Sequence, residues 1–412
     1  MAESTAVSAF GAQNARRYLL LACGTAVSLS FGLHAVAPAL PLVQDVFGLS
    51  DFEVGLVTSA YVLPGVVLAV PLGVLADLAG RRRVFVAAGV LYGLAGAVQG
   101  WAPSFGWLLT GRLVQGVAFA ALMPLTVTVL GDAFSGLAQV RAQAQRQVTM
   151  AVAQLAMPLL GAQLAAVGWF LPFWAQAVAV LPGLWALWVL DDRRGGDVKK
   201  VGYVSRAATA VRQMGFPSVL FLNFMRFFAR FAVLGYLPLH LTRQLDASLI
   251  EVGMLIGVAT GVAFVSAMAA ARVSAIFPPS RVVLGALLAL GAGLLGFSAS
   301  PNLLVAFAVA VAFALGDGLI AVLGSAYAAA GTPDDVRAGV VALDGTARNA
   351  GKFVGPLAVG AIATATGIAP ALAVIGAIVA ATALIIPAGL IHLDHVLRES
   401  QVEAPTGRGV AL

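Results

Sequence analysis

The stretch Gly73-Val74-Leu75-Ala76-Asp77-Leu78-Ala79-Gly80-Arg81-Arg82-Arg83 decides the fold, because it ends one apolar run of membrane-spanning length and precedes another that begins at Val84. Glycines at positions 73 and 80 permit a tight turn and close backbone approach. Asp77 stands four residues before Arg81, so the two side chains can pair, or Asp77 can cap a neighbouring helix end. The three consecutive arginines predict that this loop stays on the cytoplasmic side of a membrane.

The composition is typical of a protein that lies in lipid. Of the 412 residues, 60% are hydrophobic and only 10% are charged, whereas soluble domains carry about 25% charged residues. A membrane-spanning helix needs about 20 mostly apolar residues, and the charged and Pro/Gly breaks divide the chain into twelve runs of that length. The predicted spans are 18–41, 53–76, 84–101, 105–130, 147–168, 170–190, 217–241, 251–271, 282–299, 301–325, 343–366 and 369–391.

The basic residues are distributed unequally between the loops. Eighteen of the 24 Lys and Arg residues fall in the tails or in every second loop, five fall inside spans, and one, Arg243, falls in the other set of loops. The positive-inside rule therefore predicts a multi-pass protein of the cell membrane with both termini in the cytoplasm. Trp101, Trp107 and Trp169 lie in the opposite turns, as expected for an aromatic belt. The net charge of +6 thus reflects topology, and no nucleic-acid partner is expected.

Cysteine and motif content exclude several classes of protein. Cys23 is the only cysteine, which excludes disulfides and cysteine metal sites, and the sequence has no cluster of metal ligands. It also has no P-loop and no nucleophile elbow, so neither ATP-driven transport nor a membrane enzyme is favoured, and no cofactor is expected. The apolar run after Arg16-Arg17 is too long for the core of a signal peptide, so we expect it to remain as the first span.

A repeat with an offset of 198 residues divides the chain into two halves. Ser50–Gly55 and Ser248–Gly253 both read Ser-x-x-Glu-x-Gly at the start of a span, which is a capping-box pattern. The same offset pairs Arg83-Val84 with Arg281-Val282, Gly93 with Gly291, Pro103 with Pro301, and Pro158 with Pro356. The predicted segments are a leader at 1–17, a six-helix half at 18–190, a charged cytoplasmic linker at 191–216, a second six-helix half at 217–391 and a cytoplasmic tail at 392–412.

The pattern G-x-x-x-D-x-x-G-R-R-R at 73–83 resembles the signature loop between helices 2 and 3 of the major facilitator superfamily of secondary transporters. The alternative is an ordinary hairpin with its positive charge inside. The resemblance implies an all-α membrane fold of twelve helices in two six-helix pseudo-repeats, with substrate bound near the membrane midplane between the halves. In that family the loop acts as a conformational latch, a role that would fall to Gly73, Asp77, Gly80 and Arg81.

The second copy of this loop lacks the residues of the signature pattern. The offset of 198 residues places Ala275, Pro278 and Pro279 at the positions equivalent to Asp77, Gly80 and Arg81. The latch is therefore expected in the N-terminal half alone.

Helix 4 carries a second family pattern. Gly111-Arg112-Leu113-Val114-Gln115-Gly116 resembles the family's R-x-x-Q-G motif, which in proton-coupled members is linked to proton transfer. That role would fall to Arg112, and Gln115 is expected to line the substrate cavity. The alternative is a structural arginine bonded to carbonyl groups.

Helices 5 and 11 carry the remains of a motif associated with exporters. Only Pro158 and Gly161 of that motif survive in helix 5, whereas the repeat copy in helix 11 keeps Gly351-x-x-x-Gly355-Pro356. Proline and glycine within a span permit bending and close helix contact. We expect that role for Pro158, Gly161, Gly355 and Pro356.

Three residues inside spans are candidates for proton coupling. Asp317, in Gly316-Asp317-Gly318 of helix 10, is the only carboxylate well inside any predicted span. His34 lies in helix 1, where many drug–proton antiporters of the superfamily carry an acidic residue, although a histidine packed in its neutral form fits the sequence equally well. Arginine keeps its charge at any working pH, so Arg112 can influence the proton but cannot carry it. Asp317 is therefore expected to carry the proton, ahead of His34.

Polar residues of helices 7 and 11 are expected to face the substrate. Arg226 and Arg230 are four residues apart and share one helical face, although Arg226 can instead extend toward the cytoplasmic boundary. Asp317 and Lys352 fall at similar depth, which predicts an ion pair, either structural or released on protonation. Five cations within the spans against one deep carboxylate favour a negatively charged substrate. The cavity candidates are Gln115, Asn223, Arg226, Arg230, Arg348, Asn349 and Lys352.

These patterns together predict a monomeric secondary transporter that works by alternating access. It resembles the twelve-helix drug–proton antiporter branch, which implies proton-coupled export of a small molecule such as a drug or metabolite. Uptake or exchange of a small organic anion is the first alternative, and a non-transporting membrane sensor or scaffold is the second. The expected partners are a small-molecule substrate, protons and the lipid bilayer.

Overall fold

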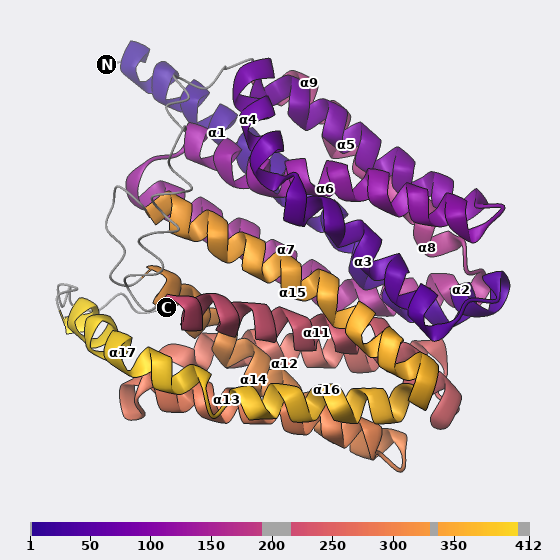
Figure 1. Ribbon diagram of the computed structural model, residues 1–412. Helices are drawn as coiled ribbons and strands as arrows, with labels where there is room; N and C mark the ends of the chain where they lie inside the picture. The colour runs from indigo at the N-terminus through magenta and orange to yellow at the C-terminus, as the bar shows by residue number, and fades with distance from the viewer. Residues whose placement is uncertain (1, 192–215, 330–336, 403–412) are drawn as a thin grey trace.

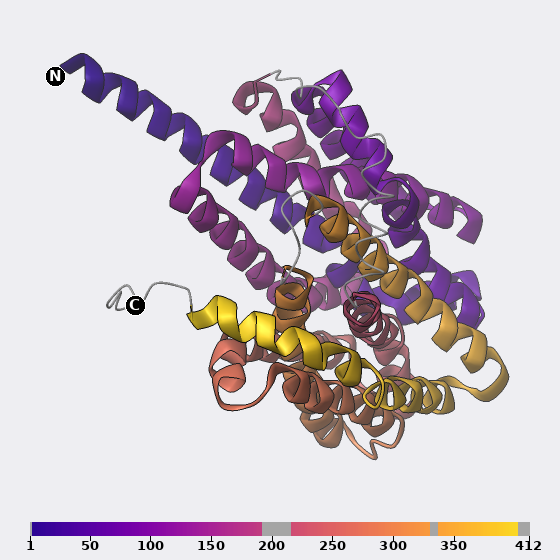
Figure 2. The ribbon, with the colours of Figure 1, turned by 60° about the vertical axis from the view of Figure 1, so that its left-hand side comes forward.

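The computed structural model describes residues 2–191, 216–329 and 337–402, and these ranges contain helices but no strand. Long helices run side by side in two bundles, α1 to α9 in one and α11 to α17 in the other (Figure 1). Most of the predicted linker 191–216 and the end of the predicted tail lie outside the described residues. The first turns of α1 project beyond the bundle (Figure 2).

The first bundle, or N-half, consists of α1 (Ala2–Ser30), η1 (Phe31–Ala35), η2 (Ala37–Ala39), α2 (Leu40–Phe47), α3 (Asp51–Val67), α4 (Ala69–Ala79), α5 (Arg81–Val98), η3 (Gln99–Trp101), α6 (Phe105–Ala133), α7 (Gly136–Val167), α8 (Leu171–Trp174), η4 (Ala175–Ala179) and α9 (Val180–Val189). The second bundle, or C-half, consists of α11 (Pro217–Gln244), α12 (Leu249–Ile276), α13 (Pro279–Ser298), α14 (Leu303–Ala329), α15 (Arg337–Thr366), α16 (Ile368–Thr382) and α17 (Ile386–Val402).

The predicted twelve-helix fold is confirmed. Within the described residues, ten helical segments are long and apolar enough to cross a membrane, and α3 with α4 forms an eleventh that is bent by 62°. The twelfth is α15, whose 30 residues extend over about 45 Å at 1.5 Å per residue. Its charged side chains lower its hydropathy below that of the other spans. They belong to Arg337, Asp344, Arg348 and Lys352.

Several helix boundaries differ from the predicted spans. The helix α7 begins at Gly136 rather than 147, and the last predicted span, 369–391, covers α16 and only the first turns of α17, which ends at Val402. Hydropathy detects only the apolar part of a helix, because backbone hydrogen bonding continues where side chains become polar. The first span is also interrupted by η1 and η2, next to Pro38 and Pro41, whose nitrogens cannot donate a helical hydrogen bond.

Both predicted capping boxes are present. The Ser50 Oγ accepts a hydrogen bond from the Glu53 N–H at 3.3 Å, and a Glu53 carboxylate oxygen accepts one from the Ser50 N–H at 2.8 Å. Ser248 and Glu251 form the same two bonds at the same distances. We call this end of the molecule the capping-box end and the opposite end, where α4 meets α5, the basic end.

The repeat-related glycines Gly93 and Gly291 occupy equivalent crossings. A Cβ atom at Gly93 would lie 2.8 Å from the backbone nitrogen of Val180, at the start of α9. One at Gly291 would lie 2.7 Å from the backbone nitrogen of Ala380, in α16. Each glycine therefore lets the third span of its half pack closely against the sixth, where any larger residue would force the helices apart.

The two halves meet in the part of the molecule nearest the capping-box end. There the Arg243 guanidinium on α11 forms an ion pair with the Asp51 carboxylate on α3 at 2.9 Å. The Tyr236 hydroxyl donates to the Asp51 carbonyl at 2.5 Å, and the Ser59 hydroxyl donates to the Phe353 carbonyl at 2.8 Å. Because these bonds join α3 to α11 and α15, the capping-box end is closed.

Candidate transport site

The buried Asp317 carboxylate bridges two arginines of α11. Its Oδ1 lies 2.7 Å from the Nε of Arg226, and its Oδ2 lies 2.6 Å from the Nη1 of Arg230. The Nε of Arg226 also donates to the Asp317 carbonyl at 3.1 Å. The flanking residue Gly318 faces the carbonyl of Ala263, so α14 packs directly on α12 at this depth.

The predicted Asp317–Lys352 ion pair is wrong. The Lys352 ammonium donates instead to the side-chain oxygen of Asn349 at 3.1 Å and lies 4.9 Å from the ring centroid of Phe227. Similar depth in two helices does not fix the direction in which each side chain leaves its helix. Asn349 in turn donates to the Gly65 carbonyl at 3.0 Å, which connects this region to the N-half.

A second buried carboxylate, Asp344, was not among the predicted site residues. Its Oδ2 pairs with the Nη2 of Arg348 at 2.5 Å, and its Oδ1 accepts from the Nδ2 of Asn223 at 2.6 Å. Asp344 lay at the edge of the predicted span 343–366, where a charge is unremarkable, although its i, i+4 spacing to Arg348 was a usable signal. Because Arg348 is neutralised here, the predicted surplus of cations is smaller than the sequence indicated.

Arg112 lies inside the N-half, away from this cluster. Its Nη1 donates to the Gly32 carbonyl at 2.7 Å and to the Gln115 side chain at 3.2 Å, and its guanidinium lies 5.0 Å from the Phe173 ring centroid. Gln115 also donates to Gln176. Both residues therefore join helices of one bundle, with Arg112 holding the carbonyl of the interrupted first span.

The predicted latch residues surround the junction of α4 and α5. Gly80 has φ +98°, which favours glycine, and the Nη1 of Arg81 lies 2.5 Å from the carboxylate of Asp132 at the end of α6. Arg81 also pairs with Asp77 at 3.4 Å, at the predicted i, i+4 spacing. A Cβ atom at Gly73 would meet no neighbour within 4 Å, so packing does not require glycine there.

The predicted helix-contact residues lie at close crossings. Gly161 on α7 faces the carbonyl of Ala35, and Gly355 on α15 faces the carbonyl of Phe228. The helices α7 and α15 continue through Pro158 and Pro356 without a break. Small residues at these positions thus bring α7 against the first span and α15 against α11.

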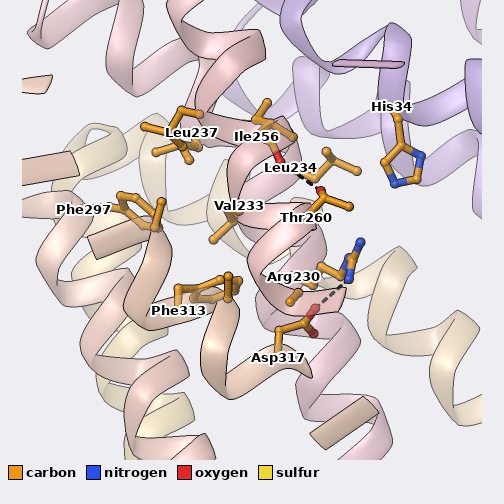
Figure 3. A pocket seen from close by; sticks show the side chains of 15 residues that line it. His34, Arg230, Val233, Leu234, Leu237, Ile256, Thr260, Phe297, Phe313 and Asp317 are labelled. Carbon is orange, nitrogen blue, oxygen red and sulfur yellow. Dashed lines mark hydrogen bonds and ion pairs between the residues drawn. The ribbon is translucent and has the colours of Figure 1, made fainter. Parts of the chain in front are cut away.

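A cavity lies between the halves beside Asp317 (Figure 3). Its polar groups are His34 from η1, Arg230 and Asp317, which gather at one end together with Thr260. The remaining lining is apolar and includes Phe297 and Phe313. Of the predicted cavity residues, only Arg230 lines this space, while the predicted proton-coupling residues His34 and Asp317 also border it.

Comparison with known proteins gives one family. The model of the Major Facilitator Superfamily matches residues 20–208 and 219–410. The bacillibactin exporter of Bacillus subtilis (strain 168) is 28% identical over 152 residues, which are 35% of this chain and 38% of the exporter. The arabinose–proton symporter of the same organism is 27% identical over 118 residues, 28% of this chain and 25% of the symporter. The matched segments thus span well under two thirds of these relatives.

Among solved structures, a bacterial homologue of the human lysosomal transporter Spinster, in an inward-facing and unoccupied conformation, has a TM-score of 0.75 to this chain at 18% identity. The match covers 93% of this chain and 98% of that one. At this level of identity the similarity concerns the fold.

Proposed function

Because the chain belongs to the major facilitator superfamily of transporters, we propose that it exports a small organic molecule across the cell membrane in exchange for protons. The distribution of basic residues supports a topology with both termini and the basic end in the cytoplasm. In that orientation, the closed capping-box end faces the outside of the cell. Because both halves that enclose the cavity belong to one chain, we propose that a monomer is sufficient for transport.

The observation that carries the proton assignment is the Asp317 carboxylate held between Arg226 and Arg230 beside the cavity. A coupling group must take up and release a proton, and arginine cannot do so at working pH. Protonation of Asp317 cancels both ion pairs, which releases α14 from α11. The protonation state of one carboxylate thus controls the packing of two helices at the substrate cavity, which is what coupling requires.

The signature loop supplies a second control at the basic end. Arg81 joins the start of α5 to Asp132 on α6 and to Asp77 on α4. These bonds lie within the N-half and hold its cytoplasmic ends as one rigid unit. We propose that this unit acts as a latch that sets the balance between the two states without contacting substrate.

The experiment that tests the proposed direction compares everted and right-side-out membrane vesicles against a panel of small molecules. Export predicts accumulation in everted vesicles, driven by an interior-acid pH gradient and abolished when a protonophore collapses that gradient. Vesicles that contain Asp317→Asn serve as the matched control. Accumulation only in right-side-out vesicles would contradict export.

Uptake or exchange of a small organic anion is a second candidate. The observation that favours it is charge: Arg226 and Arg230 share the one carboxylate of Asp317, and Lys352 forms no ion pair among the described residues and donates to Asn349. The same vesicle experiment separates the two candidates, because uptake predicts accumulation in right-side-out vesicles under an inward proton gradient.

A further inference from the structure

The Arg230 guanidinium at the polar end of the central cavity has unused hydrogen-bond donors. A guanidinium group has five N–H donors. Of the nitrogen atoms of Arg230, only Nη1 has a hydrogen-bond partner among the described residues, and that partner is the Asp317 carboxylate. The His34 ring, from the other half, points toward this guanidinium (Figure 3). The side chain of His34 is buried. An arginine with unused donors from one half and a polar ring from the other therefore border one space.

The carboxylate oxygens at this end are already bound. Both oxygens of Asp317 accept from arginines, and the Thr260 hydroxyl donates its single proton to the Ile256 carbonyl of its own helix at 2.9 Å. A cationic ligand would find no carboxylate without an arginine partner here and would face the Arg230 guanidinium. A neutral apolar ligand would remove water from Arg230 and leave its remaining donors without partners, which costs free energy.

The opposite end of the cavity is lined by apolar side chains. Leu237, Phe297 and Phe313 lie there, away from His34 and Arg230 (Figure 3). The cavity is therefore amphipathic, with the polar side chains of Arg230 and His34 at one end and aromatic and aliphatic walls at the other.

We propose that this cavity binds an amphipathic organic monoanion, with its acid group between His34 and Arg230 and its apolar body against Phe297 and Phe313. The inference rests on the proposed function only in treating the cavity as the substrate site. It adds the chemical class of the substrate and the two residues that contact its acid group. Because His34 belongs to the N-half and Arg230 to the C-half, the anion joins the two halves when it binds.

Equilibrium binding to the purified full-length protein tests this proposal without any proton gradient. The probes are 4-phenylbutyrate, 4-phenylbutan-1-ol and 4-phenylbutan-1-amine, which share one body and differ in charge at pH 7. We expect the acid to bind about tenfold more tightly than the amine. Arg230→Gln should remove that preference by weakening the acid alone, whereas Phe313→Ala should weaken all three probes to a similar extent.

Two controls keep the test decisive. Arg272→Gln removes an exposed arginine from α12, the helix that also carries Thr260, and should leave all three affinities unchanged. If Arg230→Gln fails to fold, His34→Gln takes its place and should weaken the acid about threefold relative to the alcohol. Equal binding of acid and amine, no binding of the acid in the millimolar range, or a preference that survives loss of the arginine or histidine would overturn the proposal. A preference for the acid in a protein without proton-driven flux would instead refute only the coupling assignment.

Discussion

Opening of the capping-box end should become easier when the bonds between the halves are removed there. The double variant Tyr236→Phe with Arg243→Gln deletes two bonds to Asp51, one to its carbonyl and one to its carboxylate. Both bonds join α11 to α3, so both must break before this end can open. Phenylalanine keeps the buried ring of Tyr236, which limits the change to the hydroxyl group.

The size of the effect follows from the two contacts. A neutral hydrogen bond contributes about 0.5–1.5 kcal/mol, and the Arg243 side chain is 44% exposed, so its ion pair contributes about 0.2–1 kcal/mol. Together they favour the closed end by about 0.7–2.5 kcal/mol. Removing both should raise the ratio of open to closed protein by about 3- to 60-fold, since 1.4 kcal/mol corresponds to a factor of ten.

The assay is the rate at which a membrane-impermeant maleimide labels Val57→Cys from outside, in a Cys23→Ala background. Val57 is buried on α3 and borders a small space with Leu234 of the other half, so labelling requires the end to open. The labelling rate should rise in the double variant by the factor above and stay constant in the control Arg272→Gln. An unchanged rate in the double variant would refute the assignment of this contact as the outer closure.

Two further predictions concern the latch and the packing of each half. Asp77→Asn should slow turnover while substrate binding and membrane insertion stay normal, because Asp77 pairs with Arg81 at the basic end and does not line the cavity. Loss of substrate binding at normal turnover would contradict the latch. Gly93→Ala and Gly291→Ala should each lower the free energy of unfolding by about 1–3 kcal/mol, measured by thermal denaturation in detergent, because each added methyl group meets the backbone of the sixth span. The exposed Gly106, where a Cβ meets nothing within 4 Å, provides the matched control as Gly106→Ala.

Features that depend on neighbours along one helix could be predicted from the sequence. The capping boxes at Ser50 and Ser248 and the Asp77–Arg81 pair all involve residues three or four apart, and the structure contains each of them. The number of spans also followed from the sequence, because bilayer thickness fixes the length of an apolar run. The polar stretch at 136–146 did not reveal its helical structure, because it has no apolar run.

Partners on different helices could not be predicted in the same way. Asp317 was expected to pair with Lys352 at equal depth, but its partners are Arg226 and Arg230 on α11. The rotation of each helix about its axis decides which side chains meet, and that rotation depends on packing between helices. Arg112 illustrates the same limit, because its bond to the Gly32 carbonyl depends on the interruption of the first span. Its predicted link to proton transfer stays a prediction.

Proton coupling through Asp317 is the central claim, and flux in proteoliposomes that contain Asp317→Asn tests it most directly. Asparagine keeps the shape of the side chain but cannot gain or lose a proton, and it retains oxygen and nitrogen atoms for hydrogen bonding near Arg226 and Arg230. The account predicts that flux driven by a pH gradient is abolished, while substrate binding and counterflow without a gradient persist. Accumulation driven by the pH gradient at the wild-type level in the Asp317→Asn protein would contradict it.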